Sequence, residues 1–214
     1  MNWLWWLIKR SKTELKIIAA TFAVLFLLPI FAVVVIANAG ITEVANALAW
    51  LNPITHKIEV KDANGTIIAE FDASTVWPTR GYVSDEFGSH DLWRRLMGLG
   101  PHTGIDIANE WGNEGDPVTP FMKGRVIKVI DDTDSSGYGK YVVIDHGHNV
   151  TSFYGHLSSI KAVIDDDVEP GDIIGLEGTS GTSTGVHLHF EIRVYGIPTN
   201  PRTFMVGEPE GNSG

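Results

Sequence analysis

Four histidines and one aspartate in three short segments have the residue types and spacing of a metal-dependent hydrolytic site. The segments are His102-Thr-Gly-Ile-Asp106, Tyr154-Gly-His156 and His187-Leu-His189. Side chains alternate between the two faces of a strand, so His187 and His189 would share one face, and so would His102 and Asp106. Catalytic zinc takes three protein ligands and keeps a fourth position for water. The spacing therefore predicts a zinc site made by His102, Asp106 and one histidine of the His187/His189 pair, with two histidines left for proton transfer.

The donor atoms of these segments favour zinc over other cations. Imidazole nitrogens with one carboxylate suit zinc, whereas calcium and magnesium prefer shells of oxygen alone. The chain has no cysteine, so a transition metal must be held by histidine, aspartate and glutamate. Bound zinc lowers the pKa of its water to about 7 and polarises a carbonyl, which is the equipment for hydrolysing an amide. Nearby histidines would accept the proton of the water or stabilise the oxyanion.

The elements that position these residues are expected to be short strands. From about Val76 onward, β-rich runs alternate with glycine-containing turns, and no long amphipathic helix is predicted after residue 53. The predicted strands are 117–121, 124–131, 140–145, 150–156, 173–177 and 186–194. In the last of them, Leu188 and Phe190 would form the apolar face and leave both histidines on the other. We expect an all-β domain, an antiparallel β-sheet arranged as a sandwich or a barrel.

The region between residues 40 and 80 is predicted to contain a helix and a hairpin. Apolar residues recur at helical spacing from Ile41 to Leu51, so a helix would continue until Pro53 stops it. Residues 57–71 consist of two alternating runs around Asn64-Gly65, the strongest local hairpin signal. We interpret the hairpin as a small unit between the N-terminal region and the catalytic domain.

Several motifs after Gly81 resemble those of the lysostaphin-type (LytM-type) zinc metallopeptidases, which are peptidoglycan endopeptidases. The matching segments are Asp85-Glu-Phe-Gly88, His102-x-Gly-x-Asp106, Tyr154-x-His156-Leu-Ser158, Gly175-x-x-Gly178-x-Ser-Gly181, Thr184-Gly-x-His187-Leu-His189-Phe-Glu191 and Asn200-Pro201. The resemblance runs from Gly81 to about Met205, well over half of the chain. The departures are mild, because Gly155 stands where alanine is expected and Val186 where proline is common. Neither change removes a functional group.

The resemblance implies roles for each residue of the predicted site. His102, Asp106 and His189 would bind zinc, while His156 and His187 would line the site as catalytic residues. It also implies an antiparallel β-sheet fold with the zinc in a groove, and peptidoglycan as the substrate. We therefore expect a zinc endopeptidase that cuts cross-links or stem peptides of the cell wall. Some members of such families have lost ligands and activate other wall hydrolases, which leaves a non-catalytic or autoinhibited activator as the alternative.

The N-terminus is predicted to anchor the protein in a membrane. Residues 17–39 are an uncharged run of 23 residues, long enough as a helix to cross a bilayer core of about 30 Å. Four basic residues and one acidic residue precede the run, so the N-terminus would be cytoplasmic and the remainder of the chain exported. The alternative is a signal peptide cleaved after Ala39, because Ala37-Asn-Ala39 has the small-x-small pattern, although its apolar core would be unusually long.

The charge distribution excludes one class of partner. The chain carries a formal net charge of −10, and the residues after Gly40 are still more acidic because the basic N-terminus precedes them. An acidic exported domain is a poor candidate for binding nucleic acid. The expected partners are peptidoglycan and the lipid bilayer, with a secretion, conjugation or division apparatus as a further hypothesis. The predicted domains are a basic N-terminus (1–16), a transmembrane helix (17–39), a juxtamembrane helix and hairpin stalk (40–80), the metallopeptidase domain (81–206) and a disordered tail (207–214).

Other polar motifs receive a structural interpretation. His56 and His90 are isolated, and His146-Gly-His148 lies at a predicted glycine turn between two strands. Asp165-Asp-Asp167 lacks the spaced oxygen ligands and the glycine of a calcium loop, so we expect an exposed turn. Val168-Glu-Pro-Gly-Asp172 resembles turns in biotinyl- or lipoyl-carrying β domains, but no convincing exposed lysine accompanies it.

Overall fold

The computed structural model describes residue 16 and residues 47–211, except residues 63, 73, 75, 97, 110 and 133–136. Residues 42–214 form one compact unit and residues 1–41 another. The predicted transmembrane helix (17–39) and most of the predicted juxtamembrane helix lie outside the described residues. In the part of the chain that is described, no helix is long and apolar enough to cross a membrane.

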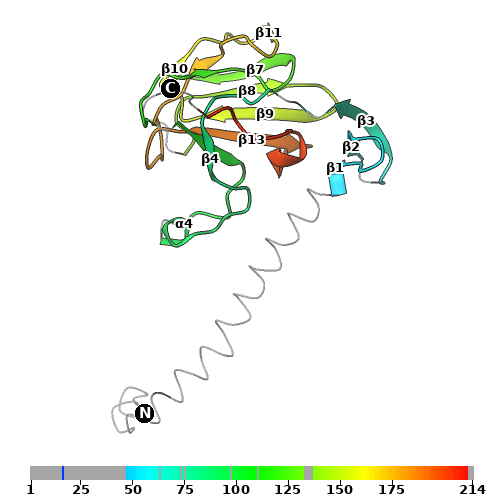
Figure 1. The fold of residues 1–214 in the computed structure, drawn as a ribbon, viewed down its shortest axis with the longest axis horizontal. Coiled ribbons are helices and arrows are strands. Elements are labelled where there is room, and N and C mark those ends of the chain that lie inside the picture. The colour runs from blue at the N-terminus through cyan, green and yellow to red at the C-terminus, as the bar shows by residue number, and fades with distance from the viewer. Residues whose placement is uncertain are drawn as a thin grey trace, which may run out of the picture. The chain divides into compact units, whose positions relative to one another are not determined.

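The centre of the larger unit is an antiparallel sheet, and Figure 1 shows its strands side by side. Its strand order is β11-β7-β8-β9-β13-β5-β4, and β14 pairs with β13 outside this path. The bounds are β4 Tyr82–Asp85, β5 Ile105–Ala108, β7 Gly124–Ile130, β8 Tyr141–Asp145, β9 Val150–Gly155, β11 Asp167–Val168, β13 Leu188–Val194 and β14 Ile197–Thr199. The expectation of an antiparallel all-β fold is confirmed.

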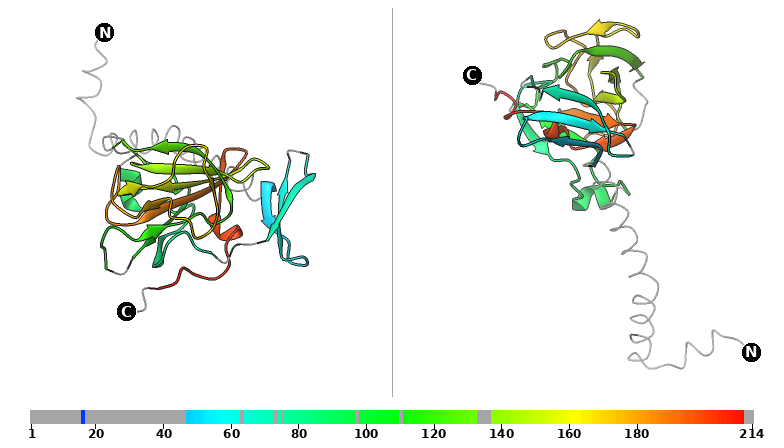
Figure 2. Two further views of the ribbon diagram at one scale, coloured as in Figure 1. Left: turned by 90° about the horizontal axis from the view of Figure 1, so that it is seen from above. Right: turned by 90° about the vertical axis from the view of Figure 1, so that its right-hand side faces the viewer.

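Two smaller antiparallel sheets accompany the large one. The first consists of β6 (Pro117–Val118), β10 (Ser159–Ile160) and β12 (Gly175–Leu176), in the order β10-β12-β6. The second consists of β1 (Ala49–Leu51), β2 (Lys57–Lys61) and β3 (Ile67–Asp72), and Figure 2 shows it as a sheet of its own. The helical elements are α4 (Leu92–Leu96) and the short 3₁₀ helix η2 (Pro201–Thr203). One cluster of buried apolar side chains includes residues of all three sheets.

Each of the six predicted strands corresponds to an observed one, and all six are shorter than expected, three of them by two or more residues. The strands expected over 117–121, 173–177 and 186–194 are β6, β12 and β13. The hairpin expected around Asn64-Gly65 is also confirmed, because β2 and β3 pair on either side of it and Gly65 has φ +81°. The turn at His146-Gly-His148 and the exposed position of residues 165–167 agree with the structural interpretation given to them.

The prediction of a helix up to Pro53 is wrong for its last part. Residues 49–51 form β1, which pairs with β2 so that Ala49 faces Val60. Ala49 is buried there, and Glu59 accepts hydrogen bonds from Trp50 Nε1 (2.9 Å) and Asn52 Nδ2 (2.5 Å). Tertiary pairing with the hairpin thus overrides the helical spacing of the apolar residues. Trp50 is part of this sheet, where it lies opposite Glu59.

The tail predicted to be disordered from Gly207 onward is ordered over residues 207–211. The backbone N–H of Gly81 donates to the carbonyl of Glu210 (2.9 Å), and Pro209 is buried. Arg202 Nη1 forms an ion pair with Glu208 (2.6 Å). These long-range contacts hold a segment whose composition alone indicates no structure. Residues 212–214 lie outside the described part.

The alternation along β13 separates the core from the opposite face of the strand. Four apolar side chains of β13 are fully buried, namely Leu188, Phe190, Ile192 and Val194. His189 and Glu191 occupy the intervening positions and therefore point to the other side of the strand. Tyr154 of the Tyr-Gly-His segment belongs to the core, because its ring packs on Phe190 and its hydroxyl accepts the N–H of Phe121 (3.2 Å).

Candidate zinc centre and hydrolytic site

The register of the large sheet brings the predicted ligands together. His189 on β13 lies opposite Asp106 on β5 and opposite Gly155 on β9. Gly104 allows β5 to approach β13, because a Cβ at this position would lie 2.3 Å from the carbonyl oxygen of Phe190. A Cβ at Gly155 would meet its nearest atoms at 3.4–3.6 Å, which is ordinary contact. The alanine that the resemblance leads us to expect there would therefore fit.

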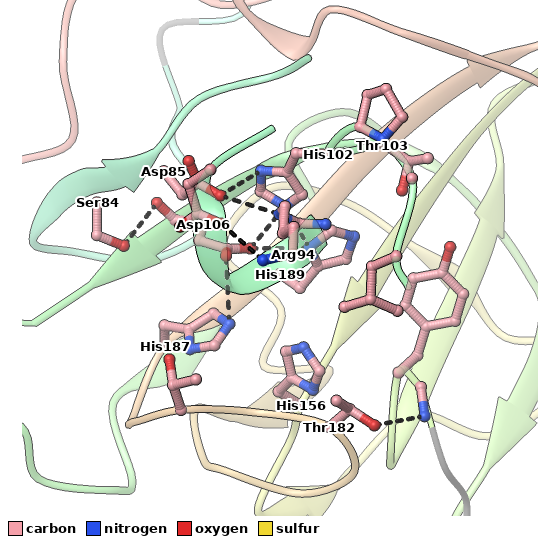
Figure 3. Close-up of a pocket in the computed structure, with 17 residues that line it drawn as sticks. Ser84, Asp85, Arg94, His102, Thr103, Asp106, His156, Thr182, His187 and His189 are labelled. Carbon is pink, nitrogen blue, oxygen red and sulfur yellow. Dashed lines mark hydrogen bonds and ion pairs between the residues drawn. The ribbon is translucent and has the colours of Figure 1, made fainter. Parts of the chain in front are cut away.

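His102, Asp106 and His189 form a compact cluster, which is shown in Figure 3. Nε2 of His102 lies 3.0 Å from Nδ1 of His189 and 3.0 Å from Oδ1 of Asp106. Nδ1 of His189 lies 2.8 Å from the same Asp106 oxygen. Both histidines are buried, with 2% and 5% of their surfaces exposed, while Asp106 is half-buried. Two nitrogens and one carboxylate oxygen thus meet at one point.

The outer nitrogen of each histidine has an acceptor that orients the ring. Nδ1 of His102 lies 3.1 Å from the carbonyl oxygen of Glu86, which can only accept, so this nitrogen carries the proton and Nε2 offers its lone pair to the cluster. Nε2 of His189 lies 3.0 Å from Oε1 of Glu191, so this ring also presents its other nitrogen. Hydrogen bonding of the second ring nitrogen to a carbonyl or carboxylate is the usual arrangement around metal-bound histidines.

The electrostatics of the cluster favour positive charge. Burial alone would lower the pKa of His189, but hydrogen bonds to Asp106 and Glu191 raise it to about 9. Burial would raise the pKa of Asp106, but its contacts with the His102 and His189 rings hold it well below its ordinary value. The pKa of Glu191 is brought down to about 2 by His189 and Arg193, against the opposite effect of burial. A divalent cation would satisfy this demand for positive charge.

The residues present therefore fit a zinc ion. Two imidazole nitrogens and one carboxylate are a donor set that zinc accepts and that calcium and magnesium do not favour. His102, Asp106 and His189 each offer one ligand atom, and these three atoms all lie within 4.8 Å of one another. Among the described residues, no other group of three His, Asp or Glu side chains meets this condition. The assignment of these three residues as ligands remains a prediction that the geometry supports.

His156 and His187 lie beside the cluster, with their ring centroids 4.8 Å apart. Nδ1 of His156 donates to the carbonyl of Ser180 (2.7 Å), and Nδ1 of His187 donates to the carbonyl of Gly185 (2.9 Å). Nδ1 is thus engaged in both rings, and Nε2 is the nitrogen left for the pocket. Nε2 of His187 lies 3.5 Å from Oδ2 of Asp106. Burial, together with the charges of His187 and His189, lowers the pKa of His156 to about 4.

The backbone of His156 adopts a left-handed conformation with φ +61°. A residue other than glycine in this region costs of order 1–3 kcal/mol, and such residues concentrate at functional sites. Its N–H donates to the carbonyl of Tyr138 (2.8 Å), so the conformation is fixed from outside the turn. This strained turn directs the imidazole into the pocket, whereas Tyr154 two residues earlier faces the core.

All five predicted site residues line one pocket of about 880 Å³. Asp85, Asp91 and Arg94, from β4 and the neighbourhood of α4, contribute to its wall, as do Tyr138 and Thr182. The pocket provides room for an extended peptide beside the cluster.

A network that the sequence interpretation did not assign supports His189. The fully buried Glu191 accepts hydrogen bonds from the hydroxyls of Thr103 and Tyr138. Arg193 donates to its other oxygen (2.7 Å) and to the Tyr138 hydroxyl (3.0 Å). Glu191 stands two positions after His189 on one strand, so the period of two was a signal for it. No comparable signal pointed to Tyr138.

Comparisons with known proteins identify a family for the chain. The model of peptidase family M23 matches residues 100–201. The chain is 39% identical over 161 residues to the DD-carboxypeptidase/endopeptidase Mpg of Neisseria meningitidis serogroup B, a match covering 70% of this chain and 33% of that protein. It is 33% identical over 129 residues to the murein hydrolase activator NlpD of Salmonella dublin, covering 60% of this chain and 30% of that protein. The chain thus spans about a third of the length of these relatives.

Two solved structures illustrate the likeness in fold. The catalytic domain of the prophage-encoded M23 protein EnpA from Enterococcus faecalis is 32% identical with a TM-score of 0.51, and the match covers 62% of this chain and 96% of that one. A zinc-containing peptidase from Vibrio cholerae is 28% identical with a TM-score of 0.52, covering 72% of this chain and 45% of that one.

Proposed function

The chain belongs to peptidase family M23, and on this premise we propose that it is a zinc endopeptidase of peptidoglycan. Its substrates would be peptide bonds in the cross-links or stems of the cell wall. The observation that carries the proposal is the convergence of five side chains on one pocket: His102, Asp106 and His189 as a ligand cluster, with His156 and His187 beside it. A peptidase needs both parts, and this chain offers residues for both.

The proposed chemistry follows from which nitrogens are free. A zinc ion held by His102, Asp106 and His189 would activate water and polarise the scissile carbonyl. His156 and His187 both direct Nε2 toward the pocket because Nδ1 donates to a backbone carbonyl. One of them would accept a proton from the attacking water, and the other would donate a hydrogen bond to the developing oxyanion after taking up a proton. The proton then passes to the released amine.

A murein hydrolase activator is the second candidate, because the chain is similar to NlpD over 129 residues. An activator needs a groove that binds a partner or the wall but has no need for catalytic groups. The complete ligand cluster and the two oriented histidines support the hydrolase. In either case the domain is proposed to act outside the cytoplasm, with residues 17–39 as a membrane anchor. Cell fractionation tests the anchor. An anchored protein should be found intact with the membrane, whereas a protein cleaved after Ala39 would be found in the soluble fraction.

Digestion of purified peptidoglycan sacculi by the full chain tests the hydrolase. Zinc is quantified in the same preparation and released fragments are identified by mass spectrometry. We expect one zinc per chain, release of peptide fragments and loss of activity on chelation. His189→Ala should lose both zinc and activity, whereas His187→Ala should keep most of the zinc and lose the rate. The matched control is His148→Asn, an exposed histidine with φ +50°, a conformation that asparagine tolerates.

Two results would count against the proposal. Normal turnover by either His187→Ala or His189→Ala would remove the assigned roles. Bound zinc without any fragment release from several wall types would instead favour the activator, and addition of wall amidases to the assay would then show whether their rate increases.

A further inference from the structure

One charged side chain of the pocket has no role in the proposed mechanism. Among the described residues that line the pocket, Arg94 on α4 is the one arginine, and there is no lysine. The carboxylates around it already have partners in the protein. Asp106 belongs to the histidine cluster, Asp85 contacts His102 Nδ1 (3.2 Å), and Asp91 accepts the backbone N–H of Arg94 (2.8 Å). The guanidinium of Arg94 is therefore the charged group on this side of the pocket that can still bind a ligand.

The guanidinium of Arg94 is anchored through one nitrogen, and its other two nitrogens remain available for a ligand. Its Nε lies 3.5 Å from Oδ2 of Asp85, and only 16% of its side chain is exposed. Its two terminal nitrogens have no hydrogen-bond or ion-pair partner among the described residues. A guanidinium presents a planar fork that matches a carboxylate, so an arginine anchored by Nε offers its two terminal groups to a carboxylate in the pocket.

Asp85 places this fork close to the predicted metal ligands. The same Oδ2 atom contacts both Arg94 and the outer edge of His102, so a single carboxylate separates the guanidinium from a ligand ring. One residue of extended peptide spans about 3.3–3.6 Å. The contacts from Nε of Arg94 to Asp85 (3.5 Å) and from Asp85 to His102 (3.2 Å) therefore keep the fork within about three residues of a bond cleaved at the cluster. Figure 3 shows Asp85 and Arg94 on the His102 side of the pocket.

We propose that Arg94 is a specificity-determining residue that binds a free carboxylate on the residue whose nitrogen leaves when the substrate is cleaved. The proposal rests on the proposed function. On the acyl side of a peptide bond, the carbon next to the carbonyl carries a nitrogen. A backbone carboxylate one residue from the bond therefore belongs to the leaving residue. Hydrolysis breaks the C–N bond, gives the hydroxyl of water to the carbonyl carbon and its proton to the amine, and leaves this carboxylate unchanged.

This requirement selects a substrate class among wall peptides. The terminal D-alanyl-D-alanine bond of a free stem has a carboxylate on its leaving residue. The bond from D-alanine to the D-centre of diaminopimelate in a direct cross-link has one at the same place. Interior bonds of a glycine bridge have none. Arg94 thus assigns the enzyme to direct cross-links and free stem ends, in preference to glycine bridges.

The test compares two stem pentapeptides that differ in one group. Both end in D-alanyl-D-alanine, one with a free C-terminal carboxylate and the other with a C-terminal amide. The wild-type full chain should hydrolyse the carboxylate form with a kcat/KM about 10- to 100-fold higher than the amide form. Arg94→Gln should remove this preference by lowering the rate on the carboxylate form alone, and Arg94→Lys should restore part of it.

Two further variants separate recognition from structure. Arg95→Gln changes the next residue of α4, an exposed arginine outside the pocket, and should keep the wild-type preference. Asp85→Asn removes the ion pair but keeps the guanidinium, and should retain most of the preference. Zinc content is measured in every variant. Equal losses on both peptides in Arg94→Gln, or an absence of preference in the wild type, would overturn the role of Arg94 while leaving the peptidase intact.

The proposed function and the role of Arg94 fail in different ways. Binding of both peptides is measured by calorimetry in the His187→Ala variant, so that recognition is read without turnover. If the wild type cleaves neither peptide nor sacculi, the proposed function fails. A carboxylate preference in binding that disappears with Arg94→Gln still supports the recognition, and equal binding of the two peptides overturns it.

Discussion

Glu177 offers a sharp test of the electrostatics outside the hydrolytic site. Its side chain is fully buried after β12, and Asn109 Nδ2 contacts Oε1 at 3.4 Å. Its second oxygen makes no hydrogen bond with the described residues. Burial, followed by repulsion from Asp116, raises the pKa of Glu177 from 4.5 to about 7. At neutral pH and above, the fold therefore has to accommodate a buried carboxylate that is poorly paired.

The sign of the pH dependence follows from the two states. In the unfolded chain Glu177 titrates near 4.5, so between about pH 4.5 and 7 the folded protein binds more protons than the unfolded chain. The free energy of unfolding falls as the pH rises through this window and is level above it. A pKa difference from 4.5 to about 7, at 1.36 kcal/mol per unit, corresponds to a loss of about 3 kcal/mol as an upper limit.

Glu177→Gln should remove this loss because the amide has nearly the same shape and no charge. We expect the variant to be more stable than the wild type at pH 8, by up to about 3 kcal/mol, and nearly equal to it at pH 5. Denaturant unfolding of the full chain, followed by circular dichroism at both pH values, measures the difference. Glu169→Gln, at an exposed glutamate, is the control and should have little effect at either pH. The reasoning would be refuted if the free energy of unfolding of Glu177→Gln changed between pH 5 and pH 8 by as much as that of the wild type.

Two further predictions concern the support of the ligand cluster. Gly104→Ala places a Cβ 2.3 Å from the Phe190 carbonyl, so it should destabilise the fold by about 1–3 kcal/mol and lower the bound zinc, while Gly155→Ala, with ordinary contacts, should do neither. Denaturant unfolding and metal analysis of the two variants decide this, and equal behaviour would contradict it. Glu191→Gln should weaken zinc binding about 10- to 100-fold in a chelator competition, because the His189 ring loses its carboxylate partner. Wild-type affinity in that variant would show that the network does not orient the ligand.

The face assignment of the site could be predicted from the sequence because it depends on local alternation. In β13 the apolar residues Leu188 and Phe190 are buried, as the period of two requires, and His189 lies on the opposite face. His102 and Asp106 also converge as expected, but His102 precedes β5 and is not in a strand, so alternation does not account for their contact. Alternation alone left open whether His187 or His189 joins them. The register of β13 against β5, which places His189 opposite Asp106, provides that information.

Features that depend on long-range contacts were not predictable in this way. Residues 49–51 have helical apolar spacing, yet pairing with β2 and the two hydrogen bonds to Glu59 make them a strand. The segment after Gly207 has a composition typical of a tail, yet Glu210 accepts a hydrogen bond from Gly81. In both cases the stabilising partner is remote from the residues that it orders, so a local pattern carries no trace of it.

One strand, β13, supplies several of the residues that build the site. The alternation that directs His189 away from the core directs Glu191 and Arg193 to the same side, so one face of β13 supplies a predicted ligand, the carboxylate that orients it and the cation that balances this carboxylate. Tyr138 completes the network from a loop, and Arg94 reaches the pocket from α4. The strand thus determines how the cluster is held, while the surrounding loops can change what the pocket recognises. On this reasoning, substitutions along β13 should affect the metal, and substitutions at Arg94 the choice of substrate.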